Sequence, residues 1–320
     1  MALLFRKKAI FAKAETTYGT DATPTGAANA VLTKNMSITP IVANVIERDL
    51  DRPTLGNDTA IHDGVHVTCT FDVELAGSGV APAAIADETD APAWSALLQA
   101  CGFNLTVTPT TSSVFAPVSS SFESVTIYLN IADQLHSLTG CFGTVSFTMN
   151  AGELPMMSFS FTGLYNAPIA ASGDSLLSTV DQSAYIQPVA VNDTNTTTAT
   201  LYGQTLVMES CSIDMGVDVQ YRNLVNDEKI IIVDRNPTGS ISFEAPDVGT
   251  YNWFTNTLTD TPAALQIVHG TTAGNILTFD APKVQVTEPS YSDSQGQVMI
   301  NANMRLTYNT GDDELSITCT

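Results

Sequence analysis

Two histidines and a run of acidic residues are the groups in this sequence whose spacing could support metal chemistry. His62 and His66 lie four residues apart, which on a helix would bring both imidazoles to one face and within reach of one metal ion. Gly64 lies between them and alternating apolar residues follow, so the pattern favours a loop that enters a strand, and no third ligand can be named. The acidic run 312–314 could bind a cation, although a solvated cluster of like charges is the simpler interpretation. We therefore predict no metal site and no cofactor.

The sequence signatures of common enzymes do not accompany these groups. There is no G-x-S-x-G elbow and no phosphate-binding loop, and the other two histidines, His136 and His269, are isolated. The five cysteines are odd in number, widely spaced and without a C-x-x-C pair. This usage favours small buried apolar residues over a disulfide framework or a zinc site. We therefore predict that the chain is not an enzyme.

The charges are few and strongly unequal. The sequence contains twelve Lys and Arg residues and 33 Asp and Glu residues, which gives a formal net charge of −21. No Lys or Arg occurs between Pro53 and Tyr221. A nucleic-acid-binding protein needs basic side chains to displace counterions from phosphate, and an anionic membrane surface makes the same demand. Both classes are disfavoured. Composition alone leaves open whether the acidic surface serves solubility or keeps DNA from adhering.

Targeting signals are also missing from the pattern. The first residues place a short apolar run before the basic cluster, which is the reverse of a secretory signal, and no run of about 18 apolar residues could span a bilayer. We expect neither a signal peptide nor a membrane anchor.

The dominant pattern is an alternation of apolar and polar residues, as half-buried strands require. In the segment 65–75 the apolar residues face one way, and Asp72 and Glu74 face the other with the threonines. Two alternating runs within 144–162 flank a turn and predict a hairpin. Further alternating runs occur at 239–245 and 298–308. Each strand thus has one face for a core and one for water.

Only two short helices are expected. The segment 90–102 begins with Asp90 as a candidate N-cap and Pro92 in the first turn, and its apolar residues recur at helical spacing. A weaker pattern covers 248–258. Two helices among many strands predict a mainly β fold, organised as β-sandwiches or half-barrels.

The order of expected elements occurs twice. A strand, a V-x-x-R-x-L segment, an alternating strand, a helix and a terminal hairpin follow one another in each half of the chain. Glu74 and Glu244 occupy the same place in the two series, near the end of the strand that precedes the helix. The polar stretch 191–200 is low in complexity and suggests a loop or linker. We predict an N-terminal arm or loop at 1–36, a first β domain at 37–165, a polar linker at 166–204 and a second β domain at 205–320.

A set of short motifs runs through nearly the whole chain. They are ETTYGTD at 15–21, SITP at 37–40, ERDLDRP at 47–53, ALLQACGF at 96–103, AGELP at 151–155, DRNPTG at 234–239, APKVQ at 281–285 and TGDDEL at 310–315. In this order they resemble the tail tube, or major tail protein, family of long-tailed bacteriophages, of the type found in siphophages and Mu-like prophages.

The resemblance implies a β-sandwich subunit whose inner sheets close into a ring on oligomerisation, with rings stacked into a hollow tube that conducts DNA into the host. It implies no catalytic, cofactor-binding or metal-binding residues. The expected partners are further copies of the chain and the tape-measure, terminator and tail-tip proteins, while DNA passes through without specific binding. The protein would lie in the virion tail after assembly in the cytoplasm of the bacterial host.

Strands that are amphipathic across their two faces suit this expectation, because one face can pack a core and the other can line an aqueous lumen. An acidic lumen would repel DNA in transit. The segment 14–36, rich in Thr, Ala and Gly, suits an arm that orders on a neighbouring subunit. The candidate lumen residues are Thr68, Thr70, Asp72, Glu74, Ser240, Ser242 and Glu244.

Ring symmetry follows from the repeat. Tail tubes of the family imply a sixfold arrangement of tube domains, so a chain with two such domains would form a trimer with pseudo-sixfold symmetry. A hexamer with one tube domain and one outward decoration domain is the alternative, and the length of the chain favours the trimer.

Three other classes compete with the tail tube interpretation. A capsid or decoration protein is another virion structural protein. A secreted β-rich adhesin or pilin-like protein would have a signal peptide and often paired cysteines. A β-rich hydrolase would have a catalytic constellation.

Overall fold

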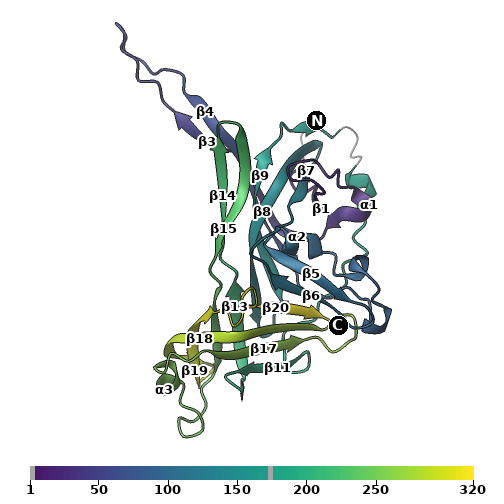
Figure 1. Ribbon diagram of the computed structural model, residues 1–320, viewed down its shortest axis with the longest axis vertical. Helices are drawn as coiled ribbons and strands as arrows, with labels where there is room; N and C mark the ends of the chain where they lie inside the picture. The colour runs from purple at the N-terminus through teal and green to yellow at the C-terminus, as the bar shows by residue number, and fades with distance from the viewer. Residues whose placement is uncertain (1–3, 172–175) are drawn as a thin grey trace.

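Antiparallel strands make up most of the chain, which the computed structural model describes over residues 4–171 and 176–320 (Figure 1). Alternating segments become strands because an extended backbone sends successive side chains to opposite faces. The segment 65–75 lies in β4 (Ile61–Glu74), and the expected hairpin is formed by β8 (Gln134–Asn150) and β9 (Met156–Tyr165). The predicted mainly β fold is confirmed, while the closed ring concerns the oligomer and stays a prediction.

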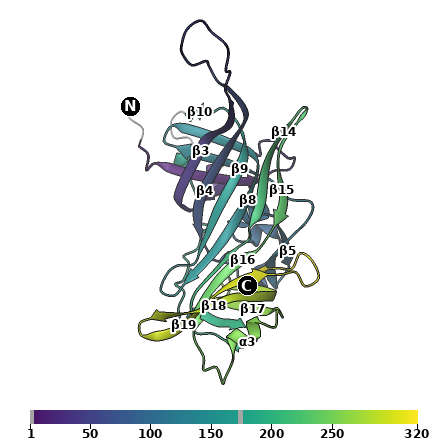
Figure 2. The same cartoon turned by 90° about the vertical axis from the view of Figure 1, so that its left-hand side faces the viewer.

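One long sheet runs through the whole molecule. From one edge to the other its strands are β3 (Thr33–Ile46), β4, β9, β8, β13 (Met208–Asp214), β16 (Thr238–Glu244), β19 (Gln297–Leu306) and β18 (Leu277–Ser294). Figure 2 shows β3, β4, β9 and β8 side by side, with β16, β18 and β19 below them. The join lies on β8, where Ser146 is paired with Ser158 of β9 on one side and with Asp214 of β13 on the other.

The same strand pairings occur twice in this sheet. The order β3–β4–β9–β8 in the first half corresponds to β13–β16–β19–β18 in the second. The second layer matches as well. In the first half β1 (Lys8–Ala14) pairs with β7 (Val125–Ile131), which pairs with the start of β8. In the second half β11 (Thr196–Leu201) pairs with β17 (Ala263–His269), which pairs with the start of β18.

Six short strands complete the second layer. They are β2 (Ala30–Val31), β5 (Phe103–Thr108), β6 (Ser112–Pro117), β10 (Ile169–Ala170), β12 (Gln204–Thr205) and β20 (Ser316–Cys319). The hairpin β5–β6 has no counterpart among the described strands of the second half. β20 joins the two halves, because it pairs with β18 on one side and β6 on the other.

The main apolar core lies between the two layers and extends through both halves, and a small second cluster surrounds Phe11. Phe147 of β8 and Phe279 of β18 meet with their ring centroids 5.4 Å apart, and Phe243 contacts Trp253 at 4.9 Å. Burying each such aromatic side chain contributes about 1.5–3 kcal/mol. Because Phe147 and Phe279 belong to different halves, the two series share part of their core.

Both helices are shorter than expected. α2 covers only Ser95–Gln99, and Asp90 does not cap it: Asp90 ends the 3-10 turn η2 (Glu88–Asp90), in which Asp87 is the N-cap and Asp90 its capping-box partner. The side chains of Asp87 and Asp90 satisfy the turn's own amides, which leaves none for a longer helix. α3 covers Trp253–Thr257, where the Asn252 side chain accepts a hydrogen bond from the amide of Thr255 at 2.9 Å. A third helix, α1 (Gly26–Asn29), was not expected.

Two segments expected to be loops are instead packed into the fold. The N-terminal segment forms β1, α1 and β2 and lies against its own chain, with Phe11 fully buried. The low-complexity stretch 191–200 contains most of β11, which pairs with β17. Its threonines are β-branched, and such residues fit a pleated strand as readily as a polar loop. A third 3-10 turn, η3 (Leu177–Thr179), and a first one, η1 (Pro82–Ala84), lie in the connections.

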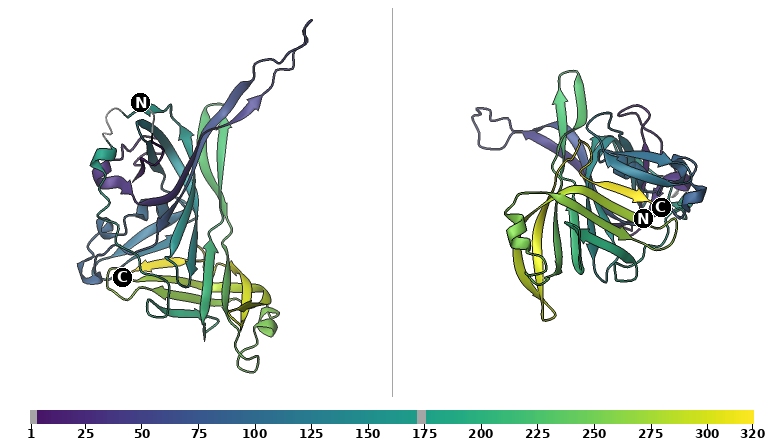
Figure 3. Two further views of the ribbon diagram at one scale, coloured as in Figure 1. Left: turned by 180° about the vertical axis from the view of Figure 1, so that it is seen from behind. Right: turned by 60° about the horizontal axis from the view of Figure 1, so that its bottom comes forward.

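Two hairpin arms project from the same end of the molecule (Figures 1 and 3). The first is the extension of β3 and β4, whose ladder continues to the pair Ile46–Ile61. The second is the hairpin of β14 (Val217–Leu224) and β15 (Asp227–Arg235), inserted between β13 and β16. Both V-x-x-R-x-L segments therefore lie on arms, at equivalent points between two strands of the central sheet.

Candidate functional site: the polar face of the central sheet

One face of the central sheet consists mainly of polar side chains, most of them short. A single row of directly paired residues crosses seven strands, and every member is polar: Asp72, Ser158, Ser146, Asp214, Thr238, Arg305 and Gln285. The opposite face carries the core residues, among them Phe71, Val73, Ile241 and Phe243, each at most 2% exposed. The strands from both halves thus present one continuous hydrophilic surface.

The seven residues predicted from the sequence all lie on this face. Thr70, Ser240 and Glu244 are exposed, whereas Thr68, Asp72 and Glu74 are half-buried. Ser242 is buried because Glu209 lies over it and accepts its hydroxyl hydrogen bond at 3.0 Å. The structure brings the two groups, four from β4 and three from β16, onto one surface, separated by β9, β8 and β13.

Hydrogen bonds hold several carboxylates of the face in place. Asp72 accepts from the Asn35 amide and from the Ser158 hydroxyl, both at 2.7 Å. Glu209 accepts from Ser294 at 2.5 Å as well as from Ser242, and Asn303 donates to Glu288 at 2.9 Å. The donors are neutral side chains, so these hydrogen bonds position the carboxylates without adding positive charge.

Two shallow polar hollows lie on the face, one in each half. The first, of about 360 Å³, is lined by Thr70, Asp72, Ser146 and their neighbours, and the second, of about 350 Å³, by Ser240, Asn301, Asn303 and theirs. Hydroxyl and amide groups dominate both hollows. Such groups make neutral hydrogen bonds with water, and the described residues offer no histidine or cysteine beside them that could activate a nucleophile.

The histidines have structural contacts. His66 stacks on Tyr221 of the second arm, with ring centroids 4.4 Å apart, and its Nδ1 lies 3.1 Å from the Gly64 carbonyl oxygen. The buried His269 contacts the Val189 carbonyl oxygen through Nε2 at 3.1 Å and the Thr196 hydroxyl through Nδ1 at 3.0 Å. Burial lowers the pKa of His269 from its usual value of 6.5. Over residues 4–171 and 176–320, no three His, Cys, Asp or Glu side chains gather as a metal site.

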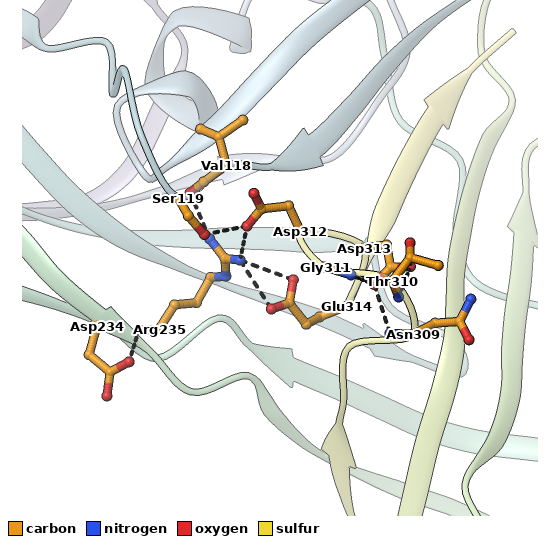
Figure 4. Close-up of polar contacts among 10 residues, drawn as sticks. All are labelled: Val118, Ser119, Asp234, Arg235, Asn309, Thr310, Gly311, Asp312, Asp313 and Glu314. Atoms are coloured by element: carbon orange, nitrogen blue, oxygen red, sulfur yellow. Dashed lines mark hydrogen bonds and ion pairs between the residues drawn. The ribbon is translucent and has the colours of Figure 1, made fainter.

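Two of the three carboxylates in the acidic run 312–314 are paired with an arginine. Arg235 at the end of β15 points into it (Figure 4) and donates from Nη2 to Asp312 at 3.1 Å and to both carboxylate oxygens of Glu314 at 3.0 and 3.1 Å. Its Nη1 donates to the Val118 carbonyl oxygen at 2.9 Å. Asp313 turns away and caps its own loop, where the amides of Asn309 and Thr310 hold its pKa at about 2.

A second polar contact that periodicity did not reveal centres on Glu15. Its carboxylate accepts from the amides of Gly19 and Gly140, both at 2.7 Å, and from the hydroxyls of Ser124 and Thr126 at 2.6 and 2.7 Å. The sequence feature that pointed to Glu15 was the motif at 15–21, of which Glu15 is the first residue. From the same motif, Tyr18 contacts β15: its hydroxyl accepts from the Ile230 amide at 2.6 Å, and burial raises the pKa of Tyr18 to about 12.

The cysteines behave as predicted. All five are free and buried. Burial raises the pKa of the Cys69 thiol to about 12, which keeps it protonated and unreactive at neutral pH. In the described parts of the chain, no helix has the length and apolar character needed to cross a membrane.

A continuous antiparallel sheet with one packed face and one hydroxyl-rich face, extended by two arms at one end, defines a mainly β protein. Residues 6–310 match the phage tail tube protein family. That match covers essentially the whole chain, so the chain belongs to the phage tail tube protein family, a structural family of virion components. No curated protein sequence matches the chain.

Proposed function

We propose that this chain polymerises into stacked rings that form a phage tail tube, the conduit through which DNA is ejected into the host. The observation that carries this proposal is the row of seven paired polar residues across the central sheet. A sheet packed on one face and uniformly hydrophilic on the other suits the wall of a water-filled tube. In this role the chain is structural and catalyses no reaction.

The polar face is the proposed lumen wall, with Thr68, Thr70, Asp72, Glu74, Ser240, Ser242 and Glu244 among its residues. Most side chains of the face are serine, threonine and asparagine, which give DNA no cationic partner, and the carboxylates of Asp72 and Glu209 repel phosphate. Arg305, and Lys34 paired opposite Asp72, add single positive charges to the face. Such a surface lets DNA pass without specific binding.

The repeated strand order supports two tube domains in one chain, at 37–165 and 205–320, each completed by an outer strand, β1 or β11. Three chains would then supply six four-stranded units, in a trimer with pseudo-sixfold symmetry. A hexamer with an outward decoration domain fits less well, because the second half joins the same sheet as the first through β8 and β13.

The two arms are the proposed contacts between rings. They expose apolar side chains that a single chain leaves uncovered, including Leu55, which is fully exposed, and Val225, which is 91% exposed. Apolar surface of this kind marks an interaction site. The tape-measure, terminator and tail-tip proteins are the further expected partners in the virion tail, with assembly in the bacterial cytoplasm.

Electron microscopy of the purified protein tests the proposal. We expect rings or tubes with a stain-filled lumen, and six similar units in a cryo-EM cross-section of the tube, contributed by three chains. A strictly monomeric protein at high concentration, together with its absence from virions, would overturn the proposal. Closed shells would favour a capsid or decoration protein, and six chains per ring would overturn the trimer.

A further inference from the structure

The central sheet ends in two unpaired strand edges. β3 pairs only with β4 among the described strands. At the other end, residues 285–294 of β18 pair only with β19, because the pairing of β18 with β17 stops at Val284. Open edges of this length are sites where another strand can add.

The molecule contains one junction of the same kind that is already closed. Residues 146–150 of β8 pair with residues 210–214 of β13 on one edge, and residues 146–148 pair with β9 on the other. This junction joins the last strand of the first four-stranded unit to the first strand of the second unit. β18 is the last strand of the second unit, and β3 is the first strand of the first unit.

The ladders fix which residues correspond in the two units. The β4–β9 ladder ends at the pair Glu74–Met156, and the β16–β19 ladder ends at the pair Glu244–Met299. From these pairs outward, residues 146–150 of β8 correspond to 290–294 of β18, and residues 212–214 of β13 correspond to 37–39 of β3, which follow a bulge between Lys34 and Ser37.

We propose that β18 of one copy pairs antiparallel with β3 of a second copy, in the register of the β8–β13 junction. Ser292 of one copy then lies opposite Ser37 of the other, as Thr148 lies opposite Ser212 within the chain. Likewise Ser290 lies opposite Thr39 and Tyr291 opposite Ile38. This inference rests on the proposed ring and names the contact that closes it.

Side-chain chemistry matches at the three pairs named above. In the closed junction one pair on the core side is Phe147–Ile213, both at most 2% exposed, and the other is Met149–Cys211, in which Asp293 of β18 takes the place of Met149. The pair that corresponds to Phe147–Ile213 is Tyr291 and Ile38, again an aromatic residue opposite an isoleucine. Tyr291 packs against Phe254 with ring centroids 5.0 Å apart and is still 59% exposed in the single chain, so most of its surface is free to contact a second copy. On the polar side, Ser292 opposite Ser37 and Ser290 opposite Thr39 correspond to Thr148 opposite Ser212 and Ser146 opposite Asp214 within the chain.

The length of the available edge also matches. In the closed junction the pairing ends at Asp214. The corresponding residue of β3 is Thr39, and the next residue is Pro40, which has no amide hydrogen to donate to a ladder. At the other end of the segment the Lys8 ammonium lies 2.9 Å from the Met36 carbonyl oxygen, and the proposed register brings Asp293 to this lysine.

Thiol cross-linking tests the register. The double variant Ser292→Cys with Ser37→Cys places two thiols on directly opposed positions, about 4.5–5.5 Å apart between Cβ atoms. The native cysteines are all buried and do not compete. With a short bismaleimide on assembled protein, we expect a ladder of covalent multimers on a denaturing gel that ends at the ring size. Mixing the two single variants should give covalent dimers, while each single variant alone gives none.

The matched control is Ser292→Cys with Ile41→Cys, which moves one thiol four residues along β3, roughly 13 Å from the opposed position. Cross-linking of this pair in place of the Ser292–Ser37 pair overturns the register. Tubes seen by electron microscopy without cross-linking of the Ser292–Ser37 pair overturn the inference and leave the proposed function standing. If the double variant and the wild-type chain are both monomeric, the proposed strand pairing and the proposed function are both overturned.

Discussion

Arg235 and Glu314 form a nearly buried ion pair, in which Nη2 of the arginine lies 3.0 and 3.1 Å from the two carboxylate oxygens and the side chains are 11% and 14% exposed. The arginine stands at the end of the β14–β15 arm, and the glutamate lies just before β20, the strand that joins the two halves. The base of one arm is thereby tied to the loops at 118–119 and 309–314.

We expect Arg235→Gln to lower the free energy of unfolding by about 3 kcal/mol, because it leaves the buried carboxylate of Glu314 without its partner. Urea denaturation followed by circular dichroism measures this change. Arg222→Gln, at an exposed position of the same arm, is the matched control and should alter stability by less than about 0.5 kcal/mol. Equal effects of the two substitutions would contradict the role of the Arg235 contacts.

Tyr18 anchors the second arm, and its removal should loosen that arm specifically. The hydroxyl exchanges two hydrogen bonds with Ile230, accepting from the amide at 2.6 Å and donating to the carbonyl at 3.2 Å. Tyr18→Phe leaves both backbone groups unsatisfied and should cost about 1–2 kcal/mol. Hydrogen exchange should become faster across β14 and β15 and stay unchanged in β4. Tyr308→Phe, which removes the hydroxyl of a tyrosine that is 71% exposed, should leave exchange unaltered.

The strands of the central sheet could be predicted from the sequence because their signal is local. A period of two in 65–75 or 144–162 records burial of one face, and the strand forms wherever that face meets a core. The helices were predicted too long because capping residues were assigned by type. Asp87 and Asp90 cap each other, and no sequence rule ranks Asp90 below Asp87.

The polar contacts of the site could not be predicted, because their partners are far apart in the chain. Arg235 is 79 residues from Glu314, and Tyr18 is 212 residues from Ile230. Such contacts depend on how the strands are arranged in three dimensions, and hydrophobic periodicity carries no information about that arrangement. The strand β11 was missed for another reason: its threonines make it β-prone, but a run of polar residues between two domains also fits a linker.

His269 makes the stability of the second half depend on pH. Burial holds its folded pKa below 6.5, so its stabilising contribution is complete above pH 6.5 and is lost as the pH falls from 6.5 through the folded pKa. We expect the wild type to lose more stability than His269→Gln between pH 7.5 and pH 5, measured by urea denaturation. His62→Gln, on the exposed first arm, should follow the wild type. Parallel pH profiles of wild type and His269→Gln would contradict this assignment.

Asp72 and Glu74 test the proposed lumen directly. Changing both to lysine replaces two negative charges by two positive ones on the polar face and leaves the buried Phe71 and Val73 in place. We expect tubes to assemble in normal number, because the substitutions lie outside the core, while DNA delivery slows as phosphate is held by the new cations. Tube assembly is counted by electron microscopy, and delivery is measured as the rate of genome ejection from phage carrying the variant. Asp193→Lys, an exposed acid away from the polar face, is the control and should eject DNA at the wild-type rate. If the double variant ejects DNA as fast as the wild type, Asp72 and Glu74 do not line the lumen.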